Sequence, residues 1–350
     1  MFLLNSKPIA YLNVLRVAGI TGVLITHVFM TTCAYWAPVL HESELYFCTV
    51  LRNLWHWCVP VLVMISGVLF LNPEKAMPIS RFFSRYVLKL FLTLVLIAIP
   101  AEVALQVFLS GFQFFPSQIK MAILNIVSGK TQTHFWFLYL IIGLYLITPL
   151  LRTFTKYANK KEYEYILVLL FVFTSFIATV KKICAINIGF NIPISSAYVM
   201  YFLLGYYLHH YNISVSNKVT LPIILCFVLY TSSAALNKNL VNPLMDNFLI
   251  TSDKDSPIIA ITASAIFIIC QKNFATCHYL DKYALLCFGI YIVHPFFIYT
   301  LYFILGLTPV KYPLYIFLPV TILTTFALSI GTSFCAKRTM KTITKIIGRL

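Results

Sequence analysis

The sequence predicts an all-α integral membrane protein, built as a bundle of about ten transmembrane helices. Hydrophobic residues make up 60% of its 350 residues and charged residues only 10%, whereas a soluble domain is about 25% charged. Long apolar runs fill nearly the whole chain, and about 20 apolar residues suffice for a helix to cross the hydrocarbon core. We therefore expect residues 1–350 to form a single polytopic domain, with no separate soluble domain.

Each apolar run is interpreted as one helix. The first run carries Arg16 and His27 and lacks a small-residue cleavage site, so we expect a retained helix rather than a signal peptide. The sixth and eighth runs are short and partly polar. The ten predicted helices cover about 9–32, 54–72, 86–109, 134–151, 163–180, 195–209, 219–236, 256–271, 284–306 and 312–334.

The lysines and arginines of the loops orient the predicted bundle. The N-terminus, the even-numbered loops and the C-terminal tail hold 17 of them, and the odd-numbered loops hold 8. Cytoplasmic loops carry the excess of these residues, which predicts that both termini are cytoplasmic. The net charge of +16 has the same explanation, so we expect no nucleic-acid partner. The nine cysteines include no C-x-x-C pair, and we expect no metal site.

Arg16 and His27 lie within the first predicted helix, where ionisable side chains are costly and mark a functional site by default. They are eleven residues apart, so they share one face of the helix at a separation of about 16 Å. This face predicts a polar channel that carries a fixed cation and a titratable base. The alternative is an arginine that reaches the cytoplasmic interface and a histidine bonded to a neighbouring helix.

Two further ionisable residues are predicted to lie deep in the membrane. His294 precedes Pro295, which removes a backbone donor and is expected to kink the ninth helix. The alternative is a histidine that only packs at the kink. Glu102 is expected at about the depth of His27, where its carboxylate would orient the imidazole or accept a proton. The alternative is a glutamate near the outer headgroups.

His134 and Trp136 fall near the outer end of the fourth predicted helix, where an interfacial belt is the ordinary interpretation. Arg81, Arg85 and Lys89 are spaced by four residues and form one stripe at the start of the third helix. This stripe is either plain cytoplasmic charge or a clamp for phosphate groups, which arginine binds with paired donors.

Several motifs follow one another along the chain, each weak alone but fairly specific in this order and spacing. On these motifs the chain resembles the integral membrane acyltransferase family 3. Within that family it resembles the O-acetyltransferases of the enterobacterial common antigen and other surface polysaccharides. The motifs are Tyr11-Leu-Asn-Val-Leu-Arg16, Val23-Leu-Ile-Thr-His27, Val59-Pro-Val-Leu-Val-Met-Ile-Ser-Gly67, Arg81 with Arg85, His134-Phe-Trp-Phe-Leu-Tyr139, Phe202-Leu-Leu-Gly205 and Phe288-Gly-Ile-Tyr-Ile-Val-His294.

The resemblance implies acyl transfer from cytoplasmic acyl-CoA to a sugar hydroxyl. The histidine and arginine that the family uses in its first helix correspond to His27 and Arg16, and its basic third-helix start corresponds to Arg81 and Arg85. Many members carry adjacent arginines at that start, and here the two are separated. Many members also have an aspartate next to the first-helix arginine, whereas this chain has only Asn13 nearby.

We therefore expect a multi-pass O-acetyltransferase of the bacterial inner membrane, surrounded by lipid, with acetyl-CoA as co-substrate. The acceptor would be a surface glycan or a lipid-linked oligosaccharide. His27 would act as general base or as a transient acyl carrier, with Arg16 and Glu102 completing the catalytic group. The donor phosphates would meet Arg81, Arg85 and Lys89, and the acceptor would meet His134, Trp136, Tyr291 and His294.

Two other classes of protein remain open at this point. A proton-coupled carrier or an exporter of lipid-linked sugars would also bury histidine, arginine and glutamate. The sequence lacks the paired repeats that many carriers show, and a carrier would not need the basic stripe. A structural membrane subunit fits poorly with several ionisable residues at depth.

Overall fold

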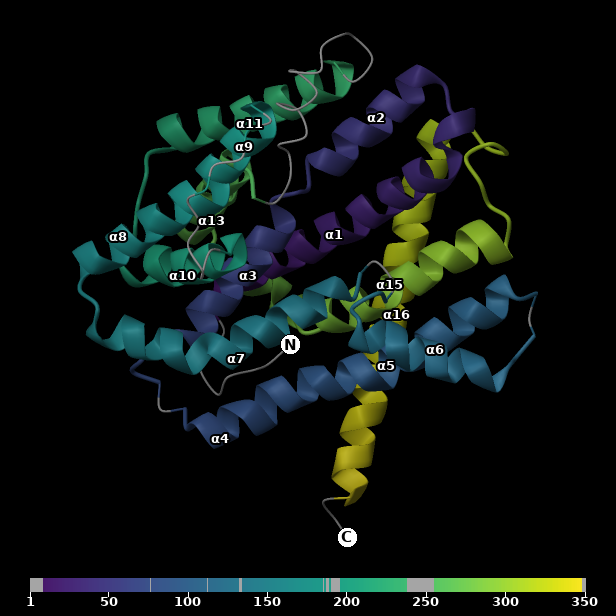
Figure 1. The fold of residues 1–350 in the computed structure, drawn as a ribbon, viewed down its shortest axis with the longest axis horizontal. Coiled ribbons are helices and arrows are strands. Elements are labelled where there is room, and N and C mark those ends of the chain that lie inside the picture. The colour runs from purple at the N-terminus through teal and green to yellow at the C-terminus, as the bar shows by residue number, and fades with distance from the viewer. Residues whose placement is uncertain are drawn as a thin grey trace. The chain divides into compact units, whose positions relative to one another are not determined.

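The computed structural model describes residues 9–347, apart from 76, 112, 132–133, 185, 187–188, 190–195 and 238–254. In the described residues every regular element is a helix (Figure 1), as the sequence predicted. The chain divides into two compact units. Unit 1 comprises the described residues up to Val68 and from Glu164 onward, and unit 2 comprises Leu69–Tyr163.

Seven helical segments are long and apolar enough to cross a membrane, so the chain is a multi-pass membrane protein. Within the described residues an eighth crossing is added if α13 (Pro257–Asn273) and the helical turns His278–Ala284 that follow it, bent by 107°, form one broken span. The seven segments are Ala10–Val39, Glu42–Phe70, Ile79–Phe108, Trp136–Tyr157, Lys160–Lys181, Cys287–Ile304 and Leu314–Thr339.

The predicted count of ten crossings is not confirmed, and three helices explain the difference. The runs at 195–209, 219–236 and 256–271 form α10, α11 and α13. α10 has 14 residues and α13 has 17, which at about 1.5 Å per residue is less than the thickness of the hydrocarbon core. The apolar part of α11 is also short. Hydropathy predicts that an apolar run is buried away from water, whereas crossing the membrane also requires a helix of sufficient length.

Unit 1 is built around α1 (Ala10–Trp36), which packs against α2, α13, α14, α15 and α16. Short 3₁₀ or π-helical turns interrupt or extend several of its helices. The elements that begin in unit 1 after α1 are η1 (Ala37–Val39), α2 (Glu42–Asn53), α3 (Cys58–Phe70), η3 (Val172–Phe176), α9 (Ile177–Cys184), α10 (Ala197–His210), α11 (Asn217–Asn237), α13 (Pro257–Asn273), η5 (His278–Leu280), α14 (Asp281–Ala284), α15 (Cys287–Tyr299), η6 (Thr300–Ile304) and α16 (Leu314–Ile347).

In unit 1, α3 and α10 cross with their backbones in contact. A Cβ atom on Gly67 of α3 would lie closer than 3.0 Å to the carbonyl oxygen of Phe202 in α10. A Cβ atom on Gly205 of α10 would also lie closer than 3.0 Å to the carbonyl oxygen of Met64 in α3. Small residues permit such close approach between membrane helices. Two of the sequence motifs that carry the family resemblance therefore meet in one helix crossing.

Unit 2 contains one long helix in three parts: α4 (Ile79–Phe82), the π-helical turn η2 (Phe83–Val87) and α5 (Leu88–Leu109). α5 packs against α6 (Pro116–Val127) and α7 (Trp136–Tyr157). α8 begins at Lys160 near the end of this unit and runs to Phe171.

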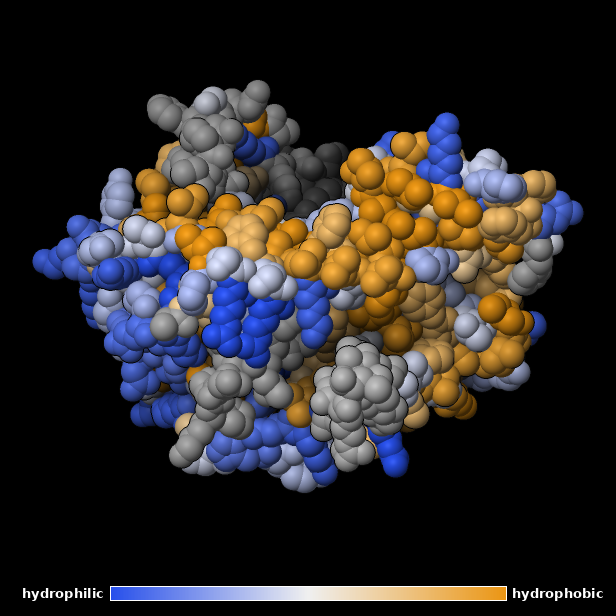
Figure 2. All heavy atoms as spheres, turned by 90° about the horizontal axis from the view of Figure 1, so that it is seen from below, coloured by the Kyte–Doolittle hydropathy of each residue, from blue (hydrophilic) through white to orange (hydrophobic). Residues whose placement is uncertain are grey.

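Large apolar side chains are exposed along these helices, as lipid-facing helices require. In α5 the exposed set is Leu88, Phe91, Leu92 and Leu96. Figure 2 shows a broad hydrophobic area on the face that it draws, beside clusters of hydrophilic side chains. A surface of this kind is typical of a protein that is solvated by lipid over part of its surface and by water elsewhere.

Candidate active site

Two of the predicted histidines meet in unit 1. His27 on α1 and His294 on α15 have ring centroids 5.1 Å apart, with 59° between the ring planes. His294 is fully buried, whereas His27 is half-buried. The sequence singled out each residue separately, and the structure brings them together where α1 packs against α15.

The ring of His294 has a defined orientation. Its Nδ1 donates a hydrogen bond of 3.0 Å to the carbonyl oxygen of Ile290, one turn earlier in α15. A carbonyl oxygen only accepts, so the proton of the neutral ring lies on Nδ1. Pro295 lies inside α15, as predicted. Tyr291 lies beside this ring, with a centroid distance of 6.3 Å.

His27 differs from His294 in its hydrogen bonding. Its carbonyl oxygen accepts a bond of 2.8 Å from the hydroxyl of Thr31. Among the described residues of unit 1, neither ring nitrogen of His27 has a hydrogen-bond partner. The imidazole is therefore positioned by ring packing while its nitrogens remain available to a substrate, which is the condition for a base or a nucleophile.

Arg16 is held by a chain of hydrogen bonds at the start of α1. It is only 7% exposed, and its Nη1 donates to Oδ1 of Asn13 at 2.9 Å. Nδ2 of Asn13 donates to Oδ1 of Asp281 at 2.7 Å, and the other oxygen of Asp281 accepts from Nδ1 of His278 at 2.9 Å. A buried cation requires such compensation, because an isolated charge is costly in an apolar medium.

Asp281 and His278 are functional candidates that the sequence did not reveal. Asp281 is 268 positions from Asn13 in the chain, and no local pattern links them. One sequence feature pointed towards them: this chain has Asn13 where many members of the resembling family have an acid beside the arginine. In the structure, Asp281 of α14 contacts Asn13, and Asn13 links this carboxylate to Arg16.

The cation stripe lies in unit 2. Arg81 is in α4, Arg85 in the π-helical turn η2 and Lys89 in α5, and all three are exposed. The guanidinium carbon of Arg85 lies 5.7 Å from the centroid of the Tyr86 ring. Exposed cations of this kind are suited to meet the phosphates of a polyanionic ligand.

The remaining candidates also belong to unit 2. Glu102 of α5 is 6% exposed, and its Oε1 accepts a hydrogen bond of 2.7 Å from Nδ2 of Asn125 in α6. His134 is buried, with its ring centroid 3.9 Å from that of Phe135. Trp136 is the first residue of α7. The bond of Glu102 joins α5 to α6, so this carboxylate has a structural partner within its own unit.

The comparison with protein-family models identifies the kind of protein. The acyltransferase domain model of acyltransferase family 3 matches residues 9–334. The chain belongs to acyltransferase family 3. No curated protein and no solved structure matches it. The family match extends over both units, so the histidine pair, the Arg16 network and the cation stripe all lie within the acyltransferase domain.

Membership in an acyltransferase family indicates which reaction the site residues must support. Acyl transfer to a hydroxyl needs a group that removes the hydroxyl proton, or a nucleophile that carries the acyl group between donor and acceptor. Within the described residues no cluster of three or more His, Cys, Asp or Glu side chains is arranged to hold a metal ion. Of the ionisable residues described above, His27 both lies in a helix that can cross the membrane and has ring nitrogens available to a substrate.

Proposed function

We propose that this acyltransferase moves an acetyl group from cytoplasmic acetyl-CoA to a hydroxyl of a cell-surface polysaccharide or its lipid-linked precursor. The observation that carries the proposal is the pairing of His27 with His294 at 5.1 Å between α1 and α15, inside a chain matched by the acyltransferase model. The O-acetyl specificity follows the resemblance to the enterobacterial common antigen type. We treat residues 1–350 as one functional domain of the bacterial inner membrane.

The topology belongs to the same proposal. Seven crossings would place the two termini on opposite sides of the membrane, whereas eight or ten would place them on the same side. The excess of lysine and arginine at both termini favours a cytoplasmic location for both. Eight crossings result if α13 and the helical turns that follow it form one bent span, and ten require α10, α11 and α13 each to cross.

The donor would bind at the cytoplasmic side, because coenzyme A is polyanionic and does not enter lipid. Arg81, Arg85 and Lys89 are exposed cations on consecutive turns of one helix, and arginine matches phosphate oxygens with paired N–H donors. Arg16, held in place by Asn13, lies about 16 Å from His27 on the same face of α1, so it would orient the bound donor along that face.

Two chemical routes use His27. As a general base, His27 removes the proton of the acceptor hydroxyl while the hydroxyl oxygen attacks the thioester carbonyl; the C–S bond breaks and the CoA thiolate takes up the proton. As a carrier, a ring nitrogen of His27 attacks the thioester carbonyl, the C–S bond breaks and the CoA thiolate leaves with the ring proton. The acceptor hydroxyl then attacks the acetyl group on the ring, the C–N bond breaks and the hydroxyl proton returns to the imidazole. General base catalysis contributes about 10²–10⁴-fold.

The acceptor would be recognised by polar and aromatic side chains. Tyr291 and His294 lie beside His27 or its partner ring in unit 1, and aromatic side chains stack on the apolar faces of sugars. In unit 2 we propose the same role for His134 and Trp136. Glu102 would assist proton transfer, and its bond to Asn125 fixes the carboxylate in one orientation.

The test is an assay of the purified protein with acetyl-CoA labelled in the acetyl group. Release of free coenzyme A together with label on a polysaccharide or lipid-linked acceptor would support the proposal. A transporter of sugars or protons would instead give flux across proteoliposomes without release of coenzyme A. Mass spectrometry of surface glycans from cells with and without the gene then identifies the acceptor sugar.

A further inference from the structure

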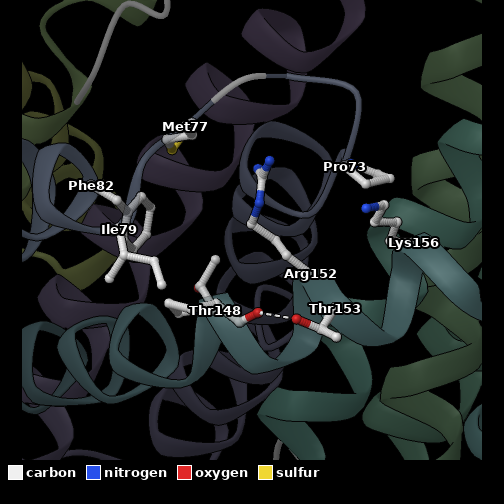
Figure 3. A pocket seen from close by; sticks show the side chains of 9 residues that line it. Pro73, Met77, Ile79, Phe82, Thr148, Arg152, Thr153 and Lys156 are labelled. Carbon is white, nitrogen blue, oxygen red and sulfur yellow. Dashed lines mark hydrogen bonds between the residues drawn. The ribbon is translucent and has the colours of Figure 1, made fainter.

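Unit 2 contains a pocket that the sequence analysis did not predict. It has a volume of about 230 Å³ and lies among the loop after α3, the start of α4 and the last turns of α7 (Figure 3). Its lining combines cationic, hydroxyl and apolar side chains. The lining residues are Pro73, Met77, Ile79, Phe82, Thr148, Pro149, Arg152, Thr153 and Lys156.

Arg152 and Lys156 make one side of this pocket cationic. They are four residues apart, one turn of α7, and Figure 3 shows both on the same side of the pocket. Nη1 and Nη2 of Arg152 donate to the carbonyl oxygens of Phe70 and Lys75 at 2.8 and 2.6 Å. These bonds hold the guanidinium rigidly at the pocket, because they fix it to the end of α3 and the loop that follows.

The positive charge around this pocket exceeds the negative charge. The lining includes no aspartate or glutamate. Partial burial, and secondarily the charge of Arg152, lowers the pKa of Lys75, whose carbonyl oxygen Arg152 binds. The larger cause is burial of the ammonium group, and the smaller is repulsion between Lys75 and Arg152. An anion in the pocket would offset that repulsion.

The opposite side of the pocket favours a ligand that has an apolar part as well as a negative charge. Met77, Ile79 and Phe82 line it with apolar surface (Figure 3). Thr153 adds a hydroxyl that donates to the carbonyl oxygen of Pro149 at 3.2 Å. A ligand that fits both sides carries a negative group joined to an apolar or aromatic body. Arginine with lysine one turn away is a combination suited to phosphate oxygens.

We propose that Arg152 and Lys156 bind a phosphate group of an amphiphilic molecule in this pocket, as a site additional to Arg81, Arg85 and Lys89. The phosphate comes either from the nucleotide part of acetyl-CoA or from the headgroup of an anionic phospholipid. The first source rests on the proposed function, since it makes the pocket part of the donor site. The second does not depend on the reaction.

The experiment compares Lys156→Gln with Lys161→Gln in lipid nanodiscs. Both lysines are exposed, both changes remove one positive charge, and Lys161 lies outside the pocket. Binding of coenzyme A is measured by calorimetry, and retention of phosphatidylglycerol is measured by native mass spectrometry. If the phosphate comes from the donor, Lys156→Gln weakens coenzyme A binding about fivefold, as expected when one exposed charge pair is lost.

If the phosphate comes from lipid, Lys156→Gln instead reduces the bound phosphatidylglycerol and leaves coenzyme A binding unchanged. In either case Lys156→Arg, which keeps the charge, retains binding, and Lys161→Gln changes neither measurement. The proposal is overturned if Lys156→Gln alters neither ligand, or if Lys161→Gln weakens binding as much. Acetyl transfer by the unaltered protein is recorded in parallel, so that failure of the proposed function is distinguished from failure of this site.

Discussion

The polar residues of unit 1 and the cations of unit 2 differ in how they are held. In unit 1, Arg16 is buried and fixed through Asn13 to Asp281. In unit 2, Arg81 and Lys89 are exposed on the surface of a long helix. The first arrangement buries the donor and fixes its direction, and the second presents charge at the protein surface.

This difference assigns different tasks to the two regions. Buried hydrogen bonds lie in a medium of low dielectric, where they are strong and where loss of one partner leaves the other uncompensated. Exposed charges are screened by salt and contribute less each. We therefore expect changes in the unit 1 network to lower turnover, and changes in the unit 2 stripe to lower affinity for the donor.

The largest effect is expected for His27→Ala. Loss of the imidazole should reduce acetyl transfer by about 10²–10⁴-fold, the range of base catalysis, while the amount of protein in the membrane stays unchanged. The measurement is the O-acetyl content of surface glycans, together with turnover of labelled acetyl-CoA. The control is His210→Ala: this exposed ring at the end of α10 stacks on Tyr206. Retained transfer in His27→Ala would remove this residue from the mechanism.

The next effect tests the close packing of unit 1 against the open packing of α7. Gly67→Ala should destabilise the protein by more than about 2 kcal/mol, because the new Cβ would overlap the backbone of Phe202. Gly143→Ala in α7 should be neutral or stabilising by about 0.5–1 kcal/mol, since a Cβ there meets nothing within 4 Å. Thermal unfolding in detergent measures both. Equal effects would mean that the crossing of α3 and α10 is not a tight contact.

A smaller effect is expected for Asp281→Asn, which keeps the shape of the side chain and removes its charge. Turnover should fall about tenfold, as for loss of one hydrogen bond to a charged group, with little change in KM for acetyl-CoA. The double variant Asn13→Asp with Asp281→Asn returns a carboxylate to the neighbourhood of Arg16 and should recover part of the turnover. Unchanged turnover in Asp281→Asn would show that the charge at this position is unimportant, and a double variant no better than Asp281→Asn would show that a carboxylate at position 13 cannot replace it.

The smallest effect is expected in the cation stripe of unit 2. Arg85→Ala should raise KM for acetyl-CoA about fivefold with little change in kcat, and the difference should shrink as salt is added. The control is Lys120→Ala, which removes an exposed cation of α6 outside the stripe. An unchanged KM in Arg85→Ala would remove this residue from donor binding, and a fall in kcat instead would contradict the division of tasks between the two units.

The same contrast explains what the sequence could predict about the site. Arg16, His27 and His294 are visible in the sequence because each interrupts an apolar run, and a polar residue in such a place is informative by itself. Asp281 cannot be recognised from the sequence, because it lies in a short helix outside the apolar runs and its role depends on its contact with Asn13. The pocket at Arg152 was missed for a similar reason: its cations look like ordinary loop charge until α7 is placed against the loop after α3.

The fold was predictable to a similar degree. Composition and apolar runs predict an all-helical membrane protein, because lipid leaves the backbone few alternatives. They do not predict which helices cross: α10 is apolar along most of its length, yet it has only 14 residues. Gly67 and Gly205 were visible in separate motifs, and their meeting in one crossing depends on tertiary structure that no local pattern encodes.

The π-helical turn η2 determines how the cations of unit 2 are aligned. Residues four apart drift around a regular α-helix by about 40° per step, so Arg81 and Lys89 would point about 80° apart on one. A π-helical turn holds more residues than an α-helical turn, and this extra length within Phe83–Val87 takes up most of the drift. Alignment of the stripe is therefore a matter of chain length as well as of charge. Deletion of one residue in that turn, with every cation kept, would leave Arg81 and Lys89 seven residues apart on a regular α-helix, still within about 20° of alignment, so KM for acetyl-CoA should stay nearly unchanged.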